Sequence, residues 1–279
     1  MPNQDNTALA SQHYENFPVA SFALPKDLRY PIALIYHFAR CADDFADEDN
    51  HTQAERLVLL QGYVDELNII KANGSSQDAF FIEFAQMLRD RKLPLAPFYD
   101  LLDAFKQDVI KTRYVNFDEV LDYCKRSANP IGALLLHLFN KASPKNLAYS
   151  DNICSALQLI NFYQDVAIDF DDTDHPRRIY CCQDEMQEFG ITETQMAAQQ
   201  SNVNWERFMR FNVERAETML QTGKPLGRIL PGRMGLEMRL IIAGGETIIR
   251  KLKVVNGDVF HKRPTIKAWD WPAILIKAI

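Results

Sequence analysis

Residues 151–170 read DNICSALQLINFYQDVAIDF, a stretch without Gly or Pro in which apolar residues recur at helical spacing. This spacing predicts a helix. At about 100° per residue, four polar side chains fall within about 80° of one another on its surface: Gln158, Asn161, Asp165 and Asp169. The positions around them are strongly apolar, so the polar stripe indicates a polar cavity inside a helical bundle.

A second stretch, residues 36–48, reads YHFARCADDFADE and carries a similar face. The same rotation brings four side chains within about 60° of one another: Tyr36, Arg40, Asp43 and Asp47. One interpretation of either face is a solvated acidic surface. However, ionised Asp side chains four residues apart repel each other by roughly a few tenths of a kcal/mol. Two such faces in one chain therefore favour functional carboxylates.

The distribution of Gly and Pro predicts long helices. The chain has only 11 Gly, and its 13 Pro leave long uninterrupted gaps. Together with start signals such as the Thr52 and Glu55 capping box, they predict helices over about 28–49, 53–72, 76–91, 95–110, 117–127, 130–141, 151–170, 203–221 and 233–255. Alternating strand patterns are nearly absent, which argues against a Rossmann sheet or a β-sandwich. The sequence therefore predicts an all-α helical bundle with a central apolar cavity.

The organisation of the chain predicts a single domain over residues 1–279. No Gly/Ser-rich or charged linker separates two halves, and 279 residues are enough to bury a large core. The N-terminal end is polar, and we expect residues 1–15 to be flexible.

Charge and cysteine content argue against several function classes. The 31 Lys and Arg against 37 Asp and Glu give a net charge of −6, so nucleic acid is not an expected partner. The five Cys show no metal-ligand spacing and are expected to be reduced. The sequence shows neither a signal peptide nor a membrane-spanning stretch. We therefore expect a cytoplasmic protein that at most lies on the inner face of a membrane.

Two carboxylate faces beside apolar surface suggest magnesium chemistry. Mg²⁺ prefers oxygen ligands and commonly takes one or two carboxylates plus phosphate oxygens. Carboxylates alone would repel a leaving diphosphate, whereas bound magnesium reverses the sign of the local charge. Arg40, with Arg177 or Arg178, is placed to neutralise the remainder. Two alternatives stay open: a non-catalytic acidic scaffold, and a di-iron bundle, of whose two Glu-x-x-His motifs the chain has only Glu48 to His51.

In order and spacing, these residues resemble the motifs of the squalene and phytoene synthase family. The resemblance covers most of the chain and rests on Ser21-Phe22, Tyr36-x3-Arg40-x2-Asp43-Asp44-x2-Asp47, Tyr123-Cys124, Gln158-x2-Asn161-x3-Asp165-x3-Asp169 and Arg178-Ile179-Tyr180. Within the family, the chain is most similar to the bacterial hydroxysqualene synthases of hopanoid pathways. This closer likeness rests on segments such as Ser127-Ala128-Asn129-Pro130-x-Gly132 and Gly257-Asp258-Val259-Phe260.

The resemblance implies a magnesium-dependent enzyme that converts presqualene diphosphate and water into hydroxysqualene and diphosphate. The alternative is head-to-head condensation of two farnesyl or geranylgeranyl diphosphates to presqualene diphosphate, squalene or phytoene. The first reaction implies two pathway partners, a presqualene diphosphate synthase and a hydroxysqualene reductase. NADPH is not expected as a cofactor. The lack of a G-x-G-x-x-G motif supports this only weakly, because squalene synthases bind NADPH without one.

The resemblance also implies a role for each matched residue. Magnesium and diphosphate would be bound by Asp43, Asp47, Asp165 and Asp169. Contacts to the diphosphate, or completion of the metal sites, would come from Ser21, Arg40, Gln158, Asn161, Gln164 and Arg178. The reacting carbons would be faced by Tyr36, Tyr123 and Tyr180, whose rings or hydroxyls can stabilise a cation.

Two positions depart from the family pattern. Gln164 stands where most members have Arg, and the loss of that charge puts the condensation of two farnesyl diphosphates in doubt. Asn129 stands in a segment that is usually small and Gly-containing. It is a candidate to hold the water that quenches the cation, but the N-cap of the helix over 130–141 is the favoured interpretation.

Two features near the C-terminus each admit two interpretations. Residues 250–267 carry six Lys or Arg and a single Asp. They indicate either a solvated segment or a basic flap that reaches the diphosphate through Lys262 or Arg263. Residues 269–279 are apolar but too short to span a bilayer. They either pack against the protein or enter a membrane interface.

Overall fold

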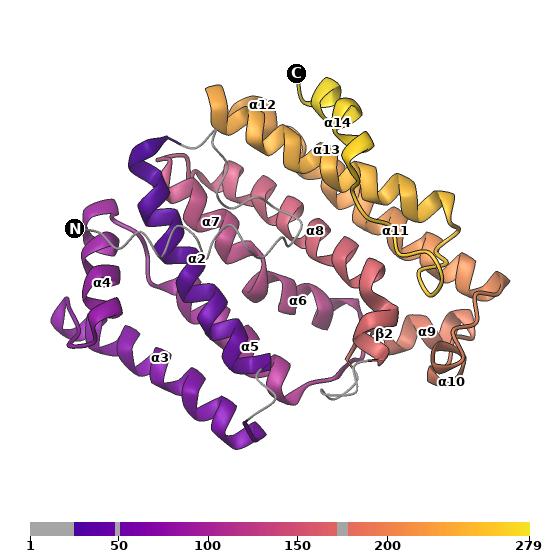
Figure 1. Cartoon of the computed structure of the whole chain (residues 1–279), viewed down its shortest axis with the longest axis horizontal. Coiled ribbons are helices and arrows are strands. Elements are labelled where there is room, and N and C mark those ends of the chain that lie inside the picture. The colour runs from indigo at the N-terminus through magenta and orange to yellow at the C-terminus, as the bar shows by residue number, and fades with distance from the viewer. Residues whose placement is uncertain (1–24, 48–50, 172–177) are drawn as a thin grey trace. The chain divides into compact units, whose positions relative to one another are not determined.

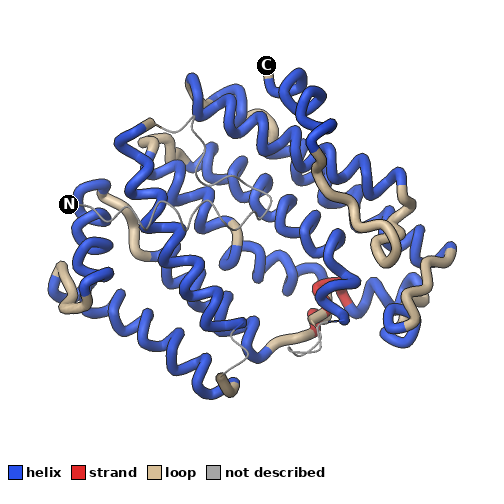
Figure 2. Tube along the Cα trace, in the orientation of Figure 1, coloured by secondary structure: helices blue, strands red, loops and turns tan. Residues whose placement is uncertain are grey.

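A computed structural model of the protein describes residues 25–47, 51–171 and 178–279. Nearly all of the regular structure in these residues is helical, and the only strands are two short segments (Figures 1 and 2). The prediction of an all-α fold is therefore confirmed. No helix in the described ranges is both long and apolar enough to cross a bilayer.

The chain divides into two compact units, each with its own helices. Unit 1 comprises residues 1–110 and 130–142. Its helices are α2 (Lys26–Asp47), α3 (Gln53–Asn73), α4 (Ala79–Arg91), α5 (Ala96–Ile110) and most of α7 (Asn129–Leu138). Unit 2 comprises residues 111–129 and 143–279. It contains β1 (Arg113–Tyr114), α6 (Phe117–Ser127), α8 (Pro144–Asp171), β2 (Ile179–Cys182), α9 (Gln183–Phe189), α10 (Glu193–Ala197), α11 (Val203–Gly223), α12 (Leu226–Ile229), α13 (Gly232–Val254), the 3-10 turn η1 (Ala268–Asp270) and α14 (Trp271–Ala278). A single domain over residues 1–279 stays a prediction.

Aromatic packing holds unit 1 together. Phe38 on α2 is fully buried and stacks on Phe84 of α4, with ring centroids 5.1 Å apart. Phe98 of α5 and Tyr63 of α3 approach the same ring at 5.1 and 5.2 Å. Ring pairs of this kind add about 0.5–1.5 kcal/mol each beyond the area they bury. The core thus fixes one side of α2 and leaves its polar residues on another.

Helix α8 is the main packing partner within unit 2, where it contacts α6, α11 and α13. Gly245 in the middle of α13 permits one of these contacts. A Cβ atom at this position would lie 2.8 Å from Leu157 Cδ2 of α8 and 3.1 Å from Leu220 Cδ2 of α11. Gly inside a helix costs about 1 kcal/mol relative to Ala, and the close approach of the three helices explains why it stands here.

The boundaries of the nine predicted helices mostly agree with the observed ones, with one clear difference, whereas the short helices α9, α10, α12 and α14 were not predicted. Thr52 and Glu55 form the predicted reciprocal capping box at the start of α3. Helix α8, however, begins at Pro144 and not near residue 151. Ser143 Oγ accepts a hydrogen bond from the Asn146 N–H at 3.3 Å, and Pro144 fits the first turn because it has no N–H to satisfy. Ser143 and Pro144 are a helix start signal in the sequence, and the predicted boundary did not take it into account.

The two strands were not predicted. Strand β1 pairs with β2 in parallel, with Arg113 opposite Ile179 and Tyr114 opposite Cys182. A strand of two residues is too short to show an alternating pattern, and its partner lies far away in the sequence. The pairing matters for the site because it places Tyr114 next to Tyr180.

Candidate functional site

The polar face of α2 is half-buried. Tyr36, Arg40, Asp43 and Asp47 all have intermediate exposure. Arg40 contacts two carboxylates of its own helix: Nη1 lies 3.4 Å from Asp43 Oδ2, and Nη2 lies 2.8 Å from Asp44 Oδ1. The side chains of Arg40 and Asp43 are 32% and 37% exposed, so water screens their attraction. The negative charges of Asp43 and Asp44 are therefore balanced by a residue of the same helix, and the attraction is weak.

The polar stripe of α8 runs between buried apolar positions. Its four members, each of intermediate exposure, are Gln158, Asn161, Asp165 and Asp169. The positions around them are buried, namely Leu159, Ile160, Phe162 and Val166. This burial pattern agrees with the stripe predicted from the helical rotation. Asp165 and Asp169 are one turn apart on the same side of the helix, the spacing at which two side chains can interact.

A basic residue from the C-terminal part of the chain reaches this stripe. Arg263 Nε donates a hydrogen bond to Asp165 Oδ1 at 2.5 Å, and the side chain of Asp165 is only 18% exposed. This hydrogen bond, with the charges of Asp165 and Asp169, raises the pKa of Arg263. The contact favours the basic-flap interpretation of residues 250–267 at this position. The sequence analysis names Arg263 as one of two residues through which such a flap reaches the diphosphate, but it does not identify Asp165 as the partner of Arg263.

Two hydrogen bonds hold the segment that carries Arg263. Gln164 Nε2 donates to the carbonyl oxygen of Pro264 at 2.7 Å, and Lys251 Nζ donates to that of Thr265 at 2.7 Å. Gln164 is 1% exposed, and its Oε1 has no hydrogen-bond partner within the described residues. Gln164 is thus buried beside the stripe, and its contact with the Arg263 segment is to backbone. Any contribution that it makes to substrate binding would be indirect.

Aromatic rings gather around Tyr180. Its ring stacks on Phe162 of α8 with centroids 3.8 Å apart and an interplanar angle of 3°. Tyr123 of α6 lies 5.7 Å away, and Tyr114 of β1 lies 5.6 Å away. The structure thus brings the predicted Tyr123 and Tyr180 together and adds two rings to them. Ring faces carry negative electrostatic potential, so such a cluster can stabilise a nearby cation.

Asn129 is buried and has a side-chain partner. It is the first residue of α7, is 8% exposed, and accepts a hydrogen bond from Ser155 Oγ of α8 through its Oδ1 at 2.9 Å. The N-cap interpretation placed it just before the helix, whereas the structure places it inside the first turn. Its other candidate role, holding the quenching water, stays a prediction.

The remaining predicted residues surround the loop after α8 or lie outside the described ranges. The backbone N–H of Arg178 donates to the carbonyl oxygen of Asp169 at 3.2 Å, so Arg178 adjoins the end of the stripe. Ser21, Arg177 and residues 1–15 lie outside the described residues, as does most of the acidic loop over 170–178.

Each pair of aspartates fits magnesium only as a partial site. Within residues 25–47, 51–171 and 178–279, no three His, Cys, Asp or Glu side chains form a group that could hold a metal ion. Mg²⁺ commonly binds one or two carboxylates and takes its other oxygens from phosphate and water. An aspartate pair on one helix face suits this mode. One pair belongs to unit 1 and the other to unit 2, and their joint action on one diphosphate stays a prediction.

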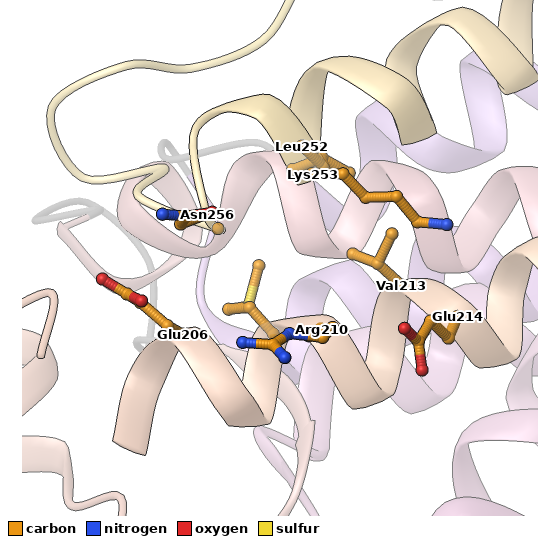
Figure 3. A pocket seen from close by; sticks show the side chains of 9 residues that line it. Glu206, Arg210, Val213, Glu214, Leu252, Lys253 and Asn256 are labelled. Atoms are coloured by element: carbon orange, nitrogen blue, oxygen red, sulfur yellow. The ribbon is translucent and has the colours of Figure 1, made fainter. Parts of the chain in front are cut away.

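A separate cavity of about 200 Å³ lies in unit 2 between α11 and the end of α13 (Figure 3). It is lined by Glu206, Met209, Arg210, Val213, Glu214, Leu252, Lys253, Asn256 and Gly257. None of these is a residue that the sequence pattern assigned to the site. The cavity thus shares no residue with the polar faces of α2 and α8.

Comparison with known protein families tests the family relationship that the motifs suggest. The squalene/phytoene synthase family model matches residues 10–270. The chain belongs to the squalene/phytoene synthase family. The resemblance predicted from the sequence is thus confirmed.

Individual members of the family show how far the likeness extends. The hydroxysqualene synthase of Sinorhizobium fredii is 31% identical over 88% of this chain and 82% of its own length. That of Rhodopseudomonas palustris is 32% identical over 90% of this chain and 84% of its own length. The crystal structure of squalene synthase HpnC from Alicyclobacillus acidocaldarius matches with a TM-score of 0.81 and 30% identity, over 90% of this chain and 93% of that one.

Proposed function

We propose that the chain converts presqualene diphosphate and water into hydroxysqualene and diphosphate, as an enzyme of isoprenoid and hopanoid biosynthesis. The observation that carries this proposal is the likeness to two bacterial hydroxysqualene synthases over 88% and 90% of the chain. Membership of a family of isoprenoid diphosphate enzymes supports the diphosphate substrate independently of these two relatives.

The proposed reaction exchanges a diphosphate group for a hydroxyl group. The carbon–oxygen bond to the diphosphate breaks, and the bonding electrons leave with the diphosphate. The resulting carbocation rearranges, the oxygen of water attacks it, and a proton is released. Since no electrons are gained or lost overall, NADPH is not needed in this step.

In this proposal, the carboxylate faces of α2 and α8 help the diphosphate to leave. Asp43 and Asp47, and likewise Asp165 and Asp169, would hold Mg²⁺, which when bound neutralises the leaving group. Each face also has an arginine next to a proposed ligand: Nη1 of Arg40 is 3.4 Å from Asp43, and Nε of Arg263 is 2.5 Å from Asp165. These guanidinium groups are placed to donate hydrogen bonds to phosphate oxygens.

In this proposal, the aromatic cluster around Tyr180 stabilises the carbocation. Phe162 and Tyr180 stack on each other in unit 2, and the ring of Tyr123 lies tilted against both. Their faces attract positive charge without offering a strong nucleophile. The burial of Phe162 and Tyr123, 6% and 4% exposed, limits the access of bulk water from their side. Capture by a single positioned water is thereby favoured over random quenching.

The proposed reaction needs two neighbours in a reaction sequence. One enzyme must make presqualene diphosphate from farnesyl diphosphate, and another must reduce the product, hydroxysqualene. Substrate and product both carry long hydrocarbon chains, so we also expect exchange with a lipid phase.

Product analysis tests this proposal. Purified protein with Mg²⁺ receives presqualene diphosphate or farnesyl diphosphate, each with and without NADPH. We expect hydroxysqualene from presqualene diphosphate in both conditions and no product from farnesyl diphosphate. Consumption of farnesyl diphosphate alone would instead establish the condensation reaction. Inertness in all four mixtures would favour a non-catalytic scaffold.

A further inference from the structure

Helix α14 is apolar on two opposite sides, and the chain covers only one of them. Ile274 and Ala278 are 1% and 0% exposed where α14 packs on α13. Arg239 Nε of α13 donates a hydrogen bond to the carbonyl oxygen of Ala278 and holds the helix there. At about 100° per residue, Pro272 and Ile276 point away from this contact. Ile276 is 76% exposed, whereas a helix that is hydrophobic all round is normally buried all round.

The turn before α14 extends the apolar surface. Trp269 on η1 is 72% exposed, and Leu275 on α14 is 46% exposed. The ammonium group of Lys267 lies 5.2 Å from the centroid of the Trp269 ring. An exposed Trp with a Lys beside it suits the boundary between hydrocarbon and lipid headgroups, because the ring has an apolar body and the ammonium group binds phosphate.

The charge of this part of the chain is opposite to that of the rest. Residues 224–279 contain eleven Lys and Arg against four Asp and Glu, a net of +7. Residues 1–223 contain the other 20 Lys and Arg and 33 Asp and Glu, a net of −13. A basic excess of this size attracts an anionic lipid surface.

Two carboxylates near α14 are paired with lysines, so they add no uncompensated negative charge there. Glu246 accepts from Lys224 Nζ at 2.6 Å and from Lys277 Nζ at 3.3 Å. Asp270 is 6% exposed and bonded to Lys251 Nζ at 2.5 Å. Neither carboxylate is therefore positioned to repel an anionic headgroup strongly.

We propose that the outward face of α14, with Trp269, Leu275 and Ile276, docks on an anionic lipid bilayer. The apolar side chains enter the interface while exposed basic side chains beside them, such as Lys267 and Lys277, contact the headgroups. A second copy of the chain fits this face less well, because a symmetric dimer would bring two surfaces of net positive charge together. The proposal extends the proposed function, since a bilayer is the phase that dissolves a hydrocarbon substrate and product.

Vesicle binding tests the proposal without substrate. The full chain is mixed with phosphatidylcholine vesicles that contain either no anionic lipid or about 30 mol% phosphatidylglycerol, and bound protein is measured by sedimentation. We expect binding to the anionic vesicles, a blue shift of tryptophan emission, and release by salt. Trp269→Phe should remove most of the blue shift, because Trp205 is fully buried and Trp271 at the start of α14 is less exposed than Trp269.

Matched variants separate this face from exposed apolar surface in general. Ile276→Asp should weaken vesicle binding at least about tenfold. Val203→Asp at the start of α11, where the native side chain is 67% exposed, should change binding less than about twofold, since Asp is tolerated in a first helical turn. Both variants should keep the wild-type melting temperature and wild-type turnover of detergent-dispersed substrate.

Three outcomes would overturn the proposal. The first is no binding to anionic vesicles, and the second is equal losses in the Ile276 and Val203 variants. The third is conversion of a dimer to a monomer by Ile276→Asp, measured by sedimentation velocity, which would assign the face to a second copy. Failure of the proposed reaction would appear instead in the product analysis, where detergent replaces the bilayer.

Discussion

The aspartates of α2 and α8 share a helical spacing but are neutralised in different ways. Asp43 pairs at 3.4 Å with Arg40, three residues before it, and its side chain is 37% exposed. Asp165 pairs at 2.5 Å with Arg263, which lies 98 residues further along the chain, and is 18% exposed. The first pair forms wherever α2 is helical, whereas the second requires the folded segment after α13.

The difference shows what organises each aspartate pair. A charge-assisted hydrogen bond gains strength as water is excluded, so the Asp165 pair is the better ordered of the two. The α2 face depends on local helix structure, and its charges are screened. Changes around α8 should therefore propagate through tertiary contacts, while changes on α2 should remain local.

The largest effect is expected from removing a carboxylate charge on either helix. Asp43→Asn and Asp165→Asn should each lower turnover of presqualene diphosphate at least about 1000-fold, because an amide cannot supply the charge that holds magnesium. The free energy of unfolding should change by less than about 1 kcal/mol in the α2 variant, whose ion pair is exposed. Product formation and thermal unfolding measure the two effects.

Asp44 provides the matched control. It bonds to Arg40 at 2.8 Å but does not belong to the aspartate pair four residues apart. Asp44→Asn should retain turnover within about tenfold of wild type. Equal losses in the Asp43 and Asp44 variants would contradict the assignment of Asp43 as a ligand.

A buried charge next to the α8 stripe should damage the fold before it changes the reaction. Gln164→Arg replaces the amide that donates to Pro264 and places a guanidinium group where the native side chain is 1% exposed. We expect a loss of about 3 kcal/mol in stability and no coupling of farnesyl diphosphate. Gln164→Leu, which loses the bond without adding a charge, should be less destabilised. A stable Arg variant that makes presqualene diphosphate would show that this position selects the reaction step.

Magnesium and inorganic diphosphate together should stabilise the protein. At a ligand concentration of about 100 times Kd, the expected gain is about 2.7 kcal/mol, seen as a higher melting temperature. Magnesium alone, or diphosphate with EDTA, should give a much smaller shift. Asp43→Asn and Asp165→Asn should each lose this stabilisation. If only the α8 variant loses it, the α2 face does not contribute to diphosphate binding.

The smallest effect is expected from substituting the two arginines, and these variants allow a direct comparison of the α2 and α8 faces. Arg263→Gln should lower kcat/KM by about 10- to 100-fold, and Arg40→Gln by a similar or smaller factor, because each removes one donor to the diphosphate. Arg263→Lys should recover part of the loss. Wild-type kcat/KM in Arg263→Gln would mean that the contact with Asp165 has no role in the reaction.

The local features of the site could be predicted from the sequence. Both polar faces follow from the helical repeat, which depends only on residues three and four apart. The start of α3 follows from a capping box that spans four residues. Even the burial of Gln164 agrees with the repeat, which turns it about 100° away from Asp165.

The features that were missed depend on contacts between distant segments. Arg263 reaches Asp165 across 98 residues, and no periodicity links the two. The ring of Tyr114 meets Tyr180 only because two very short strands pair in parallel. Such contacts follow from tertiary packing, which a single sequence does not display.

The segment after α13 limits what C-terminal deletion variants can show. Arg263 and Trp269 are six residues apart, at most about 20 Å even in a fully extended chain. A deletion that starts at residue 263 would remove the partner of Asp165 together with the whole apolar C-terminal helix. Loss of activity in such a truncated protein would not distinguish the two, so their contributions have to be separated by single substitutions.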